Sequence, residues 1–401
     1  MKHVLRAAAL AVLVAPLALI SSAGAANSHA NYQAVCPGPA IDATRCHAQV
    51  VTDRNGNPNA TTSPTGYGPA EFHGAYNLPT TSSSLQTIAI VDAFDDPTIR
   101  NDLTVYDQTY GIPDLPTCPT VSSQTACFVK VNQNGRTNPL PRRDAGWALE
   151  IALDVETAHA ICQNCKIILV ESRTNSFANL ATAVDTAASL GANVISNSYG
   201  GTESSGFTSY ESHYNHPGVA ITVSSGDNGY GVEVPASSPH VIAVGGTTLI
   251  LGPGNTYGAE SVWNGTGSGC STVFGAQPWQ TSAAGWALTG CGSARGNTDV
   301  AADADPTTGA SVYDTTAYQG QTGWFKVGGT SLSAPLIGAV YGLAGNASST
   351  PYPASIPYAH TGSLHDVTAG SNGICATTMC IGAPGYDGPT GVGTPNGIGG
   401  F

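Results

Sequence analysis

The feature that most constrains the fold is a series of short apolar runs separated by segments of helical composition. We expect buried strands at residues 85–92, 166–171, 192–199, 219–224 and 241–247. We expect helices between them, at 97–109, 145–161, 176–190 and 205–216. Strands that alternate with helices are typical of an α/β fold, with a doubly wound, mostly parallel sheet and helices on both of its faces. Residues 252–325 are rich in Gly, Ser and aromatic residues, and we expect long surface loops there.

The N-terminus has the pattern of a secretory signal peptide over residues 1–25. Lys2 and Arg6 precede the apolar run 7–20, and small residues follow, with cleavage expected near Ala25. No later run of 18 apolar residues occurs, so we expect a secreted, extracellular protein with no membrane span. We assign 26–66 to a short N-terminal segment and 67–401 to the main domain.

The charge of the chain argues against a nucleic-acid partner. Charged residues make up only 10% of the sequence, and 26 acidic side chains outnumber 13 basic ones. Phosphate binding needs clustered Lys and Arg, and the sequence has no such cluster beyond Arg142-Arg143. We expect no nucleic-acid partner and a monomeric protein.

Ten cysteines, an even number in an exported chain, predict five disulfides. The sequence does not determine the connectivity, but pairing of consecutive cysteines would close five short loops. Cys162 and Cys165 form a Cys-x-x-Cys motif, for which a redox or zinc site is the alternative.

Gly328-Gly329-Thr330-Ser331 leads into the apolar, helix-compatible run 336–344. Such a turn presents a side chain at a helix N-terminus, where free N–H groups stabilise a developing oxyanion. Ser331 is therefore a candidate nucleophile. A simple helix cap is the alternative for an isolated sequence of this kind.

Two acidic residues in the expected helix 145–161 form a second candidate feature. Glu150 and Asp154 are four residues apart, so they share one face of a helix that is apolar almost all round. Buried carboxylates repel each other, and a shared proton would raise one pKa. Glu150 could then act as a base that Asp154 orients.

Asp227 follows a predicted strand within a glycine-rich turn. Aspartate is common in such turns for purely local reasons. If Asp227 faces Ser331, however, its protonated carboxyl could donate a hydrogen bond to the oxyanion, which would require acidic conditions.

These motifs together resemble the sedolisins, serine-carboxyl peptidases with a subtilisin-like fold. The resemblance extends from about Tyr67 to Phe401, and its motifs are Tyr67-Gly-Pro-Ala-Glu-Phe, Glu150-x-x-x-Asp154-Val-Glu, Ser196-Asn-Ser-Tyr-Gly, Ser225-Gly-Asp227, Pro235-Ala-Ser-Ser-Pro, Ala243-Val-Gly-Gly-Thr and Gly329-Thr-Ser331-x-Ser-Ala-Pro. The resemblance implies that Ser331 is the nucleophile and Glu150 the general base. It further implies that Asp154 orients Glu150 and that Asp227 stabilises the oxyanion. The implied function is a secreted endopeptidase that acts on proteins or peptides at acidic pH.

The resemblance also implies a Ca²⁺ site near the C-terminus. Its ligands would be the carboxylates of Asp366 and Asp387 and the main-chain carbonyls of Val367, Ala383 and Gly385, all hard oxygen donors. One difference from the family concerns the N-terminus. Sedolisins are usually made with a long folded propeptide, whereas the segment 26–66 is short.

Two alternatives remain open at this stage. A subtilisin-like peptidase with a Ser-His-Asp triad would use Asp92, but no histidine has the expected sequence context; His73 and His159 are the two to consider. A secreted binding protein of the same fold, without catalysis, is the other alternative.

Overall fold

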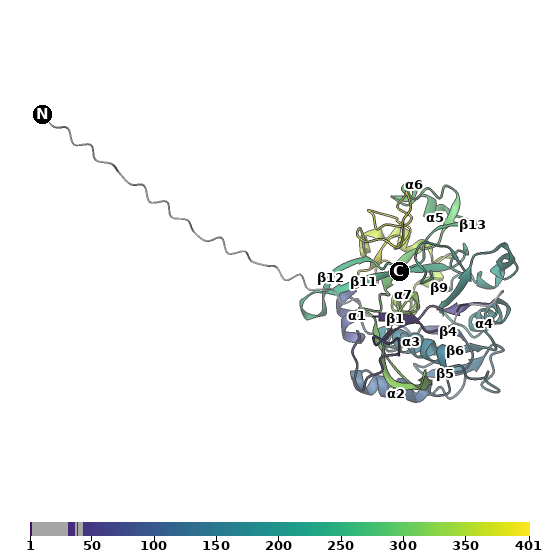
Figure 1. Cartoon of the computed structure of the whole chain (residues 1–401). Coiled ribbons are helices and arrows are strands. Elements are labelled where there is room, and N and C mark those ends of the chain that lie inside the picture. Colours follow the sequence, from purple (N-terminus) through teal and green to yellow (C-terminus); the bar gives the residue numbers. More distant parts are fainter. Residues whose placement is uncertain (2–30, 37, 39–42) are drawn as a thin grey trace.

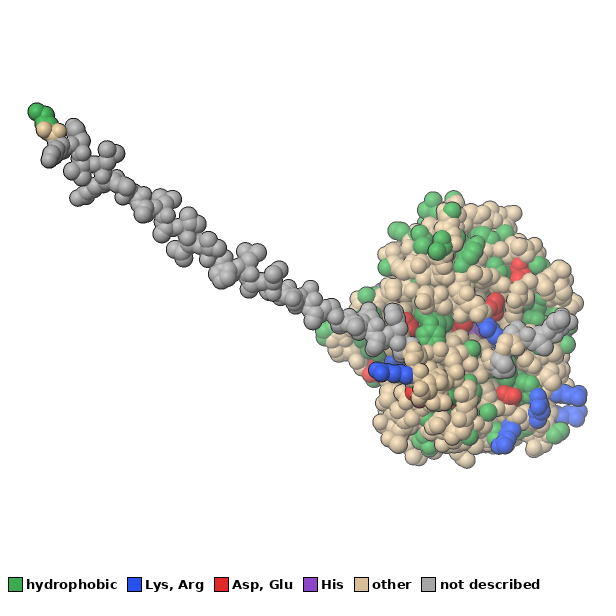
Figure 2. Space-filling model, viewed as in Figure 1, with side chains coloured by type: hydrophobic (Ala, Val, Ile, Leu, Met, Phe, Trp, Pro, Cys, Tyr) green, Lys and Arg blue, Asp and Glu red, His purple; other side chains and the backbone are tan. Residues whose placement is uncertain are grey.

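The computed structural model describes Met1, residues 31–36, residue 38 and residues 43–401. Apart from Met1, the predicted signal peptide lies outside these residues. Among the helices described, none is both long enough and apolar enough to cross a membrane. Figure 2 shows that uncharged side chains cover most of the face it presents, as the low charge content predicts.

An eight-stranded sheet forms the centre of the molecule (Figure 1). Its strands, in spatial order, are β12 (Tyr257–Val262), β11 (Ile242–Leu251), β9 (Ala220–Ser224), β7 (Val194–Asn197), β4 (Thr87–Ala93), β6 (Lys166–Ser172) and β5 (Phe128–Asn132), while β15 (Val300–Asp303) also pairs with β11. Only the β11–β12 pair in this sheet is antiparallel. The prediction of a mostly parallel α/β sheet is confirmed.

Helices pack on this sheet. The longer ones are α2 (Ile99–Tyr110), α3 (Ala145–Ile161), α4 (Phe177–Ser189) and α7 (Thr330–Ala344), and the short ones are α1 (Pro69–Ala75), α5 (Pro278–Thr281), α6 (Trp286–Thr289) and α8 (Ser355–Ala359). α3 and α7 pack against each other, α7 also packs on β7, β9, β11 and β15, and α4 packs on β4 and β6. Every residue of α3 from Trp147 to Ile161 is buried, as expected for a helix that is apolar on nearly all sides.

The five predicted strands are present, but three strands of the sheet, β5, β12 and β15, were not predicted. β5 has Lys130 at its centre, which hid it from a search for continuous apolar runs; as the last strand of the sheet it can leave Lys130 half-buried. β15 is a short Ala-rich run inside the expected surface loops of 252–325. That expectation was wrong, because this region also forms β12, β13 (Cys270–Gly275), β14 (Ala294–Gly296) and the hairpin of β16 (Ala310–Tyr318) with β17 (Gln321–Gly328).

The predicted helix at 205–216 was also wrong. The chain forms two 3₁₀ helices there, η1 (Ser205–Ser209) and η2 (Glu211–Tyr214). Ser and Gly are weak α-helix formers, and residues three apart eclipse on a 3₁₀ helix. Phe207 packs against both Tyr210 and Tyr214, so aromatic packing stabilises these tighter turns.

The N-terminal segment is an integral part of the fold. β1 (Asn31–Ala34) pairs with β3 (Gln49–Thr52), which pairs with β17; β2 (Arg45–Cys46) pairs with β8 (Tyr199–Thr202), which also pairs with β10 (Glu233–Val234). Two short strands, β18 (Leu364–His365) and β19 (Thr394–Pro395), pair near the C-terminus.

The expected pairing of consecutive cysteines is confirmed by five disulfides, which join Cys36 to Cys46, Cys118 to Cys127, Cys162 to Cys165, Cys270 to Cys291 and Cys375 to Cys380.

Candidate active site

Ser331 lies in the first turn of α7, immediately after β17, as the glycine pattern predicted. Gly329 caps the helix with a φ of +95°, a conformation that favours glycine. A Cβ at this position would lie 1.8 Å from the carbonyl oxygen of His47 and 2.7 Å from Oδ2 of Asp227. Both the backbone conformation and the crowding therefore require glycine here.

Glu150 and Asp154 face this turn from α3, and Asp92 approaches them from the end of β4. All three carboxyls are fully buried. Burial raises the pKa of Glu150 and of Asp154 well above the usual range, and the charge of Asp92 raises both further. Burial also raises the pKa of Asp92 to about 8. These groups therefore retain protons at pH values where exposed carboxyls are ionised.

The Ser331 hydroxyl lies beside Glu150 and lowers the pKa of that carboxyl. Burial has the larger effect, so the pKa of Glu150 stays well above its usual range. The aligned hydrogen bond of the Ser331 hydroxyl, however, goes to the carbonyl oxygen of Ser198, at 3.2 Å. Oε1 of Glu150 and both carboxyl oxygens of Asp154 accept no hydrogen bond within the described part of the chain. The acceptor that a serine nucleophile needs is therefore present and unpaired.

Asp227 reaches the same turn from the loop after β9. Its Oδ1 accepts hydrogen bonds from the N–H and the hydroxyl of Thr330, both at 2.8 Å, and Oδ2 accepts one from Nε2 of Gln49 at 3.1 Å. Burial raises the pKa of Asp227, while the charge of His47 and the Thr330 hydrogen bonds oppose that rise. The structure thus brings all four predicted catalytic residues to one place.

The histidines considered for a Ser-His-Asp triad lie elsewhere. Nε2 of His159 donates a hydrogen bond to the carbonyl oxygen of Pro113 at 2.9 Å, and Nε2 of His73 donates one to the carbonyl oxygen of Ala160 at 2.9 Å. The histidine nearest the serine turn is His47, but its ring nitrogens contact Ser224 and Glu233. Among the described residues, none of the three forms a hydrogen bond with Ser331, whose hydroxyl donates to the carbonyl oxygen of Ser198.

The segment that carries His47 is the part of the site that the sequence did not reveal. His47, Ala48 and Gln49 lie against Gly329, Glu150 and Asp227, although a polar, Pro- and Asn-rich N-terminal stretch gives no sign of this position. The signal in the sequence was the valine pair within Gln49–Thr52, because β-branched residues favour strands.

The five candidate Ca²⁺ ligands gather in a loop between β18 and β19. Oδ2 of Asp387 accepts a hydrogen bond from Ala383 N–H, and Oδ2 of Asp366 accepts one from Gly385 N–H, each at 2.9 Å. Within the described residues, the carbonyl oxygens of Val367, Ala383 and Gly385 accept no hydrogen bond. Burial raises the pKa of Asp387 to about 8, and the nearby charge of Asp366 adds to this. Two carboxylates and three free carbonyls fit a hard cation.

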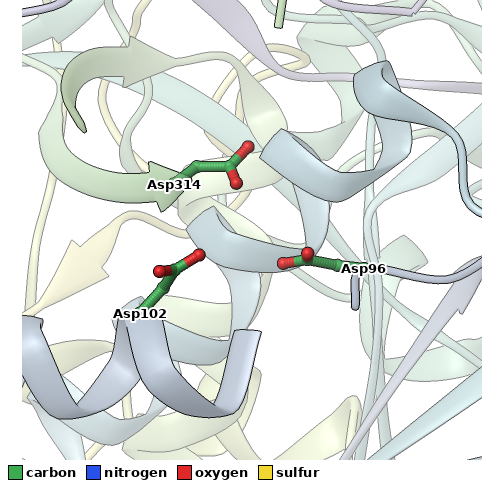
Figure 3. A group of neighbouring side chains, drawn as sticks. All are labelled: Asp96, Asp102 and Asp314. Atoms are coloured by element: carbon green, nitrogen blue, oxygen red, sulfur yellow. The ribbon is translucent and has the colours of Figure 1, made fainter. Parts of the chain in front are cut away.

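A separate acidic cluster lies near α2. Asp96, Asp102 and Asp314 are buried, and one oxygen from each lies within 4.8 Å of the others (Figure 3). Backbone N–H and hydroxyl groups of Thr98, Thr315 and Thr316 donate hydrogen bonds to these three carboxyl groups. The cluster includes none of the predicted catalytic or calcium residues.

The fold and the site together define a subtilisin-like α/β protein with a serine turn that faces buried carboxyl groups. Residues 132–359 match the model of the subtilase family, Peptidase_S8. Kumamolisin of Bacillus sp. strain MN-32 is 31% identical over 370 residues, which cover 84% of this chain and 63% of that protein. Sedolisin of Pseudomonas sp. strain 101 is 33% identical over 207 residues, 44% of this chain and 33% of that protein. The chain belongs to the subtilase family and, within it, to the sedolisins.

Solved structures agree with this assignment. Pseudomonas sedolisin, described as a serine-carboxyl proteinase and solved with two molecules of pseudo-iodotyrostatin, superposes with a TM-score of 0.66 at 25% identity, over 83% of this chain and 96% of that one. Sphericase shares the fold, with a TM-score of 0.50 at 17% identity over 84% of this chain and 98% of its own. The described chain therefore spans less than two thirds of the curated kumamolisin and sedolisin chains but nearly all of the sedolisin structure.

Proposed function

We propose that this protein is a secreted, acid-acting serine-carboxyl endopeptidase that cleaves proteins through an acyl-enzyme on Ser331. The observation that carries the proposal is the meeting of the Ser331 turn with the buried carboxyls of Glu150, Asp154 and Asp227. These residues come from α7, α3 and the loop after β9, so only the folded chain brings them together. Membership in the sedolisins supports the same roles.

In the proposed mechanism, Ser331 Oγ attacks the scissile carbonyl carbon while Glu150 takes the hydroxyl proton. Asp154 holds Glu150 in position. Glu150 then returns the proton to the leaving amine, and water hydrolyses the acyl-enzyme with Glu150 again as the base. Asp227 donates a hydrogen bond to the oxyanion in both tetrahedral states.

The proton that Asp227 must carry favours acidic pH. Asp227 can donate only while it is protonated, and its burial raises its pKa in the required direction. Glu150 must be ionised when it accepts the serine proton. Asp92 and Asp154, which lie beside it, can hold the protons that the three coupled carboxyl groups still bind. A rise in pH removes the Asp227 proton and should reduce the rate.

The experiment is digestion of a denatured protein by the purified full chain and by Ser331→Ala, from pH 3 to pH 8. We expect peptide release by the unmodified protein with a maximum on the acidic side. Equal release by both proteins would contradict the role of Ser331, and a maximum above neutrality would contradict the role of Asp227.

We also propose that Asp366 and Asp387, with the carbonyls of Val367, Ala383 and Gly385, hold Ca²⁺. When bound, the ion would neutralise two neighbouring carboxylates and tie down the C-terminal loop. It would have no part in the chemistry at Ser331. The five disulfides and the sequence of residues 1–25 support export, and we propose that the secreted protein is a monomer.

A further inference from the structure

Thr330 joins the serine turn to the proposed oxyanion donor. It is the first residue of α7, directly before Ser331, and its side chain is fully buried. Its N–H and its hydroxyl each lie 2.8 Å from the same atom, Oδ1 of Asp227. One oxygen of the Asp227 carboxyl is therefore held by two groups of a single residue.

The surroundings of the Thr330 hydroxyl fix the direction of its hydrogen bond. Oγ1 accepts a hydrogen bond from the N–H of Gly226 at 3.2 Å and donates its own proton to a second group. Two acceptors are within reach, Oδ1 of Asp227 at 2.8 Å and the carbonyl oxygen of Gly226 at 3.3 Å. Hydrogen bonds between two oxygens are usually about 2.5–3.0 Å long, so the proton goes to Asp227.

These two hydrogen bonds determine which oxygen of Asp227 carries the acid proton. A carbonyl-type oxygen has two lone pairs, and the two donors of Thr330 use both of them on Oδ1. The N–H group can only donate, so it disfavours a proton on Oδ1 whichever way the hydroxyl turns. When Asp227 is neutral, its proton therefore belongs on Oδ2.

Oδ2 is the oxygen of Asp227 that faces the catalytic turn. Nε2 of Gln49, 3.1 Å away, is its one hydrogen-bond partner within the described ranges of the chain. Oδ2 lies 2.7 Å from the point that a Cβ on Gly329 would occupy, and a peptide carbonyl oxygen, that of His47, lies 1.8 Å from the same point. The space beside Oδ2 thus admits a carbonyl oxygen close to the proposed donor.

We propose that Thr330 is a positioning residue, which keeps the acid proton of Asp227 on Oδ2, from where it is donated to the oxyanion. The inference rests on the proposed function, since Asp227 must be the oxyanion donor. The side chain of Thr330 acts through Asp227 and not on the reacting atoms. Without its hydroxyl, the carboxyl can rotate and the proton can move to Oδ1, so fewer molecules hold a donor in the productive direction.

The same hydrogen bonds also affect the charge of Asp227. Burial has the largest effect and raises the pKa of Asp227, while the hydrogen bonds from Thr330 lower it. Loss of the Thr330 hydroxyl should therefore raise this pKa and keep Asp227 protonated to higher pH. A purely structural role of Thr330 would reduce activity without this shift in the pH profile.

Four other ionisable side chains lie around Asp227 or its turn. They are His47, Tyr32, Glu150 and Glu233. The charge of His47 lowers the pKa of Asp227. All four belong to segments outside α7, so substitution of Thr330 leaves them in place, and a change in the pH profile can be assigned to the lost hydrogen bond.

The test compares the full chain with Thr330→Val, which has a similar shape but no hydroxyl, and with Thr330→Ser, which keeps the hydroxyl. The readouts are kcat and kcat/KM on a peptide substrate from pH 3 to pH 8. Thr330→Val should lower kcat by about tenfold and move the alkaline limb of kcat/KM up by about one pH unit, the effect of one hydrogen bond to a charged group. Thr330→Ser should stay within about twofold of the unmodified protein, with an unchanged limb.

Two controls identify the cause of the shift. Ser333→Ala removes a hydroxyl of the same turn that bonds to the carbonyl oxygen of Thr330 and not to Asp227, so its limb should not move. In an Asp227→Asn background, Thr330→Val should leave the limb where it is, because the side chain at that position no longer titrates. Should Thr330→Val fail to fold, Thr330→Ala lacks the same hydroxyl and must give the same shift.

The outcomes separate this inference from the proposed function. An alkaline limb that does not move in Thr330→Val, or that moves equally in Thr330→Ser or Ser333→Ala, refutes the positioning role. The proposed function then stands if Asp227→Ala still lowers kcat and Asp227→Asn still extends activity toward neutral pH. If neither Asp227 variant alters the profile, Asp227 is not the oxyanion donor and both proposals fail.

Discussion

The backbone N–H of Ala48 donates a 3.0 Å hydrogen bond to Oε2 of Glu150, and Oε1 of the same carboxyl has no hydrogen-bond partner among the described residues. One oxygen of Glu150 thus contacts a peptide nitrogen, while the other is free for the Ser331 proton. A group in this position can move a proton from nucleophile to leaving amine without a large displacement.

Removal of the Glu150 carboxylate should abolish most of the activity. We expect Glu150→Gln to lower kcat/KM on a peptide substrate by about 10²–10⁴-fold, the usual contribution of a general base. Glu156→Gln is the matched control, since Glu156 is buried on the same helix but accepts a hydrogen bond from Tyr313 N–H instead. Comparable losses in both variants would show that the effect is structural.

Substitutions of Asp227 should separate the presence of a hydrogen-bond donor from its protonation. Asp227→Ala removes the donor and should lower kcat by about 10²–10³-fold. Asp227→Asn keeps an N–H donor at every pH, so its residual activity should extend further toward neutral pH than that of the unmodified protein. The measurement is kcat/KM from pH 3 to pH 8; an unchanged alkaline limb in Asp227→Asn would contradict the assignment.

Stability should fall as pH rises from about 4 to 8. The unfolded Asp92 carboxyl titrates near the ordinary value, about 3.9, while burial raises its pKa in the folded protein to about 8. The folded state therefore binds the proton more tightly, and this stabilisation, complete below the unfolded pKa, disappears as pH rises through the folded one. The loss is on the order of a few kcal/mol, since a tenfold change in proton binding corresponds to about 1.4 kcal/mol.

Urea unfolding of the Ser331→Ala protein at pH 4, 6 and 8 measures this dependence without self-digestion. Asp92→Asn should make the free energy of unfolding depend less on pH, because one titrating group is removed. A dependence that is unchanged in Asp92→Asn, or that has the opposite sign, would refute the account.

Calcium removal should destabilise the C-terminal loop. We expect a chelator to lower the Tm of the Ser331→Ala protein by several degrees, and Asp387→Asn to lower it without further response to the chelator. Asp114→Asn is the control, because Asp114 is exposed and its ion pair with Arg100 lies at the surface. An identical chelator response in the Asp387→Asn protein would exclude this loop as the ion's site.

The sequence predicted the sheet and four candidate catalytic residues because each depends on a local pattern. These residues are Ser331, Glu150, Asp154 and Asp227. Continuous apolar runs marked the buried parallel strands, and the four-residue spacing of Glu150 and Asp154 placed both on one helix face. The strand β5 was missed because an edge position tolerates Lys130, and a search for apolar runs cannot recognise that.

The position of His47 depends on pairing between residues far apart in the chain. Its contacts with Ser224 and Glu233 join positions separated by 177 and 186 residues, and no local pattern near residue 47 encodes them. The role of Asp92 was uncertain for a related reason. Its place at a strand end suited a histidine triad, and only the packing of α3 against β4 puts it beside other carboxyls.

The most direct test of the account is to trap the covalent intermediate. The full chain is mixed at pH 4 with a peptide ester, quenched in acid within the first turnover, and mapped by mass spectrometry. We predict an acyl group on Ser331, still present in Ser333→Ala, where the neighbouring hydroxyl that bonds the Thr330 carbonyl is removed, and absent in Ser331→Ala. Turnover with no adduct on Ser331, or an adduct that persists in Ser331→Ala, would contradict the proposal that a serine served by carboxyl groups performs the chemistry.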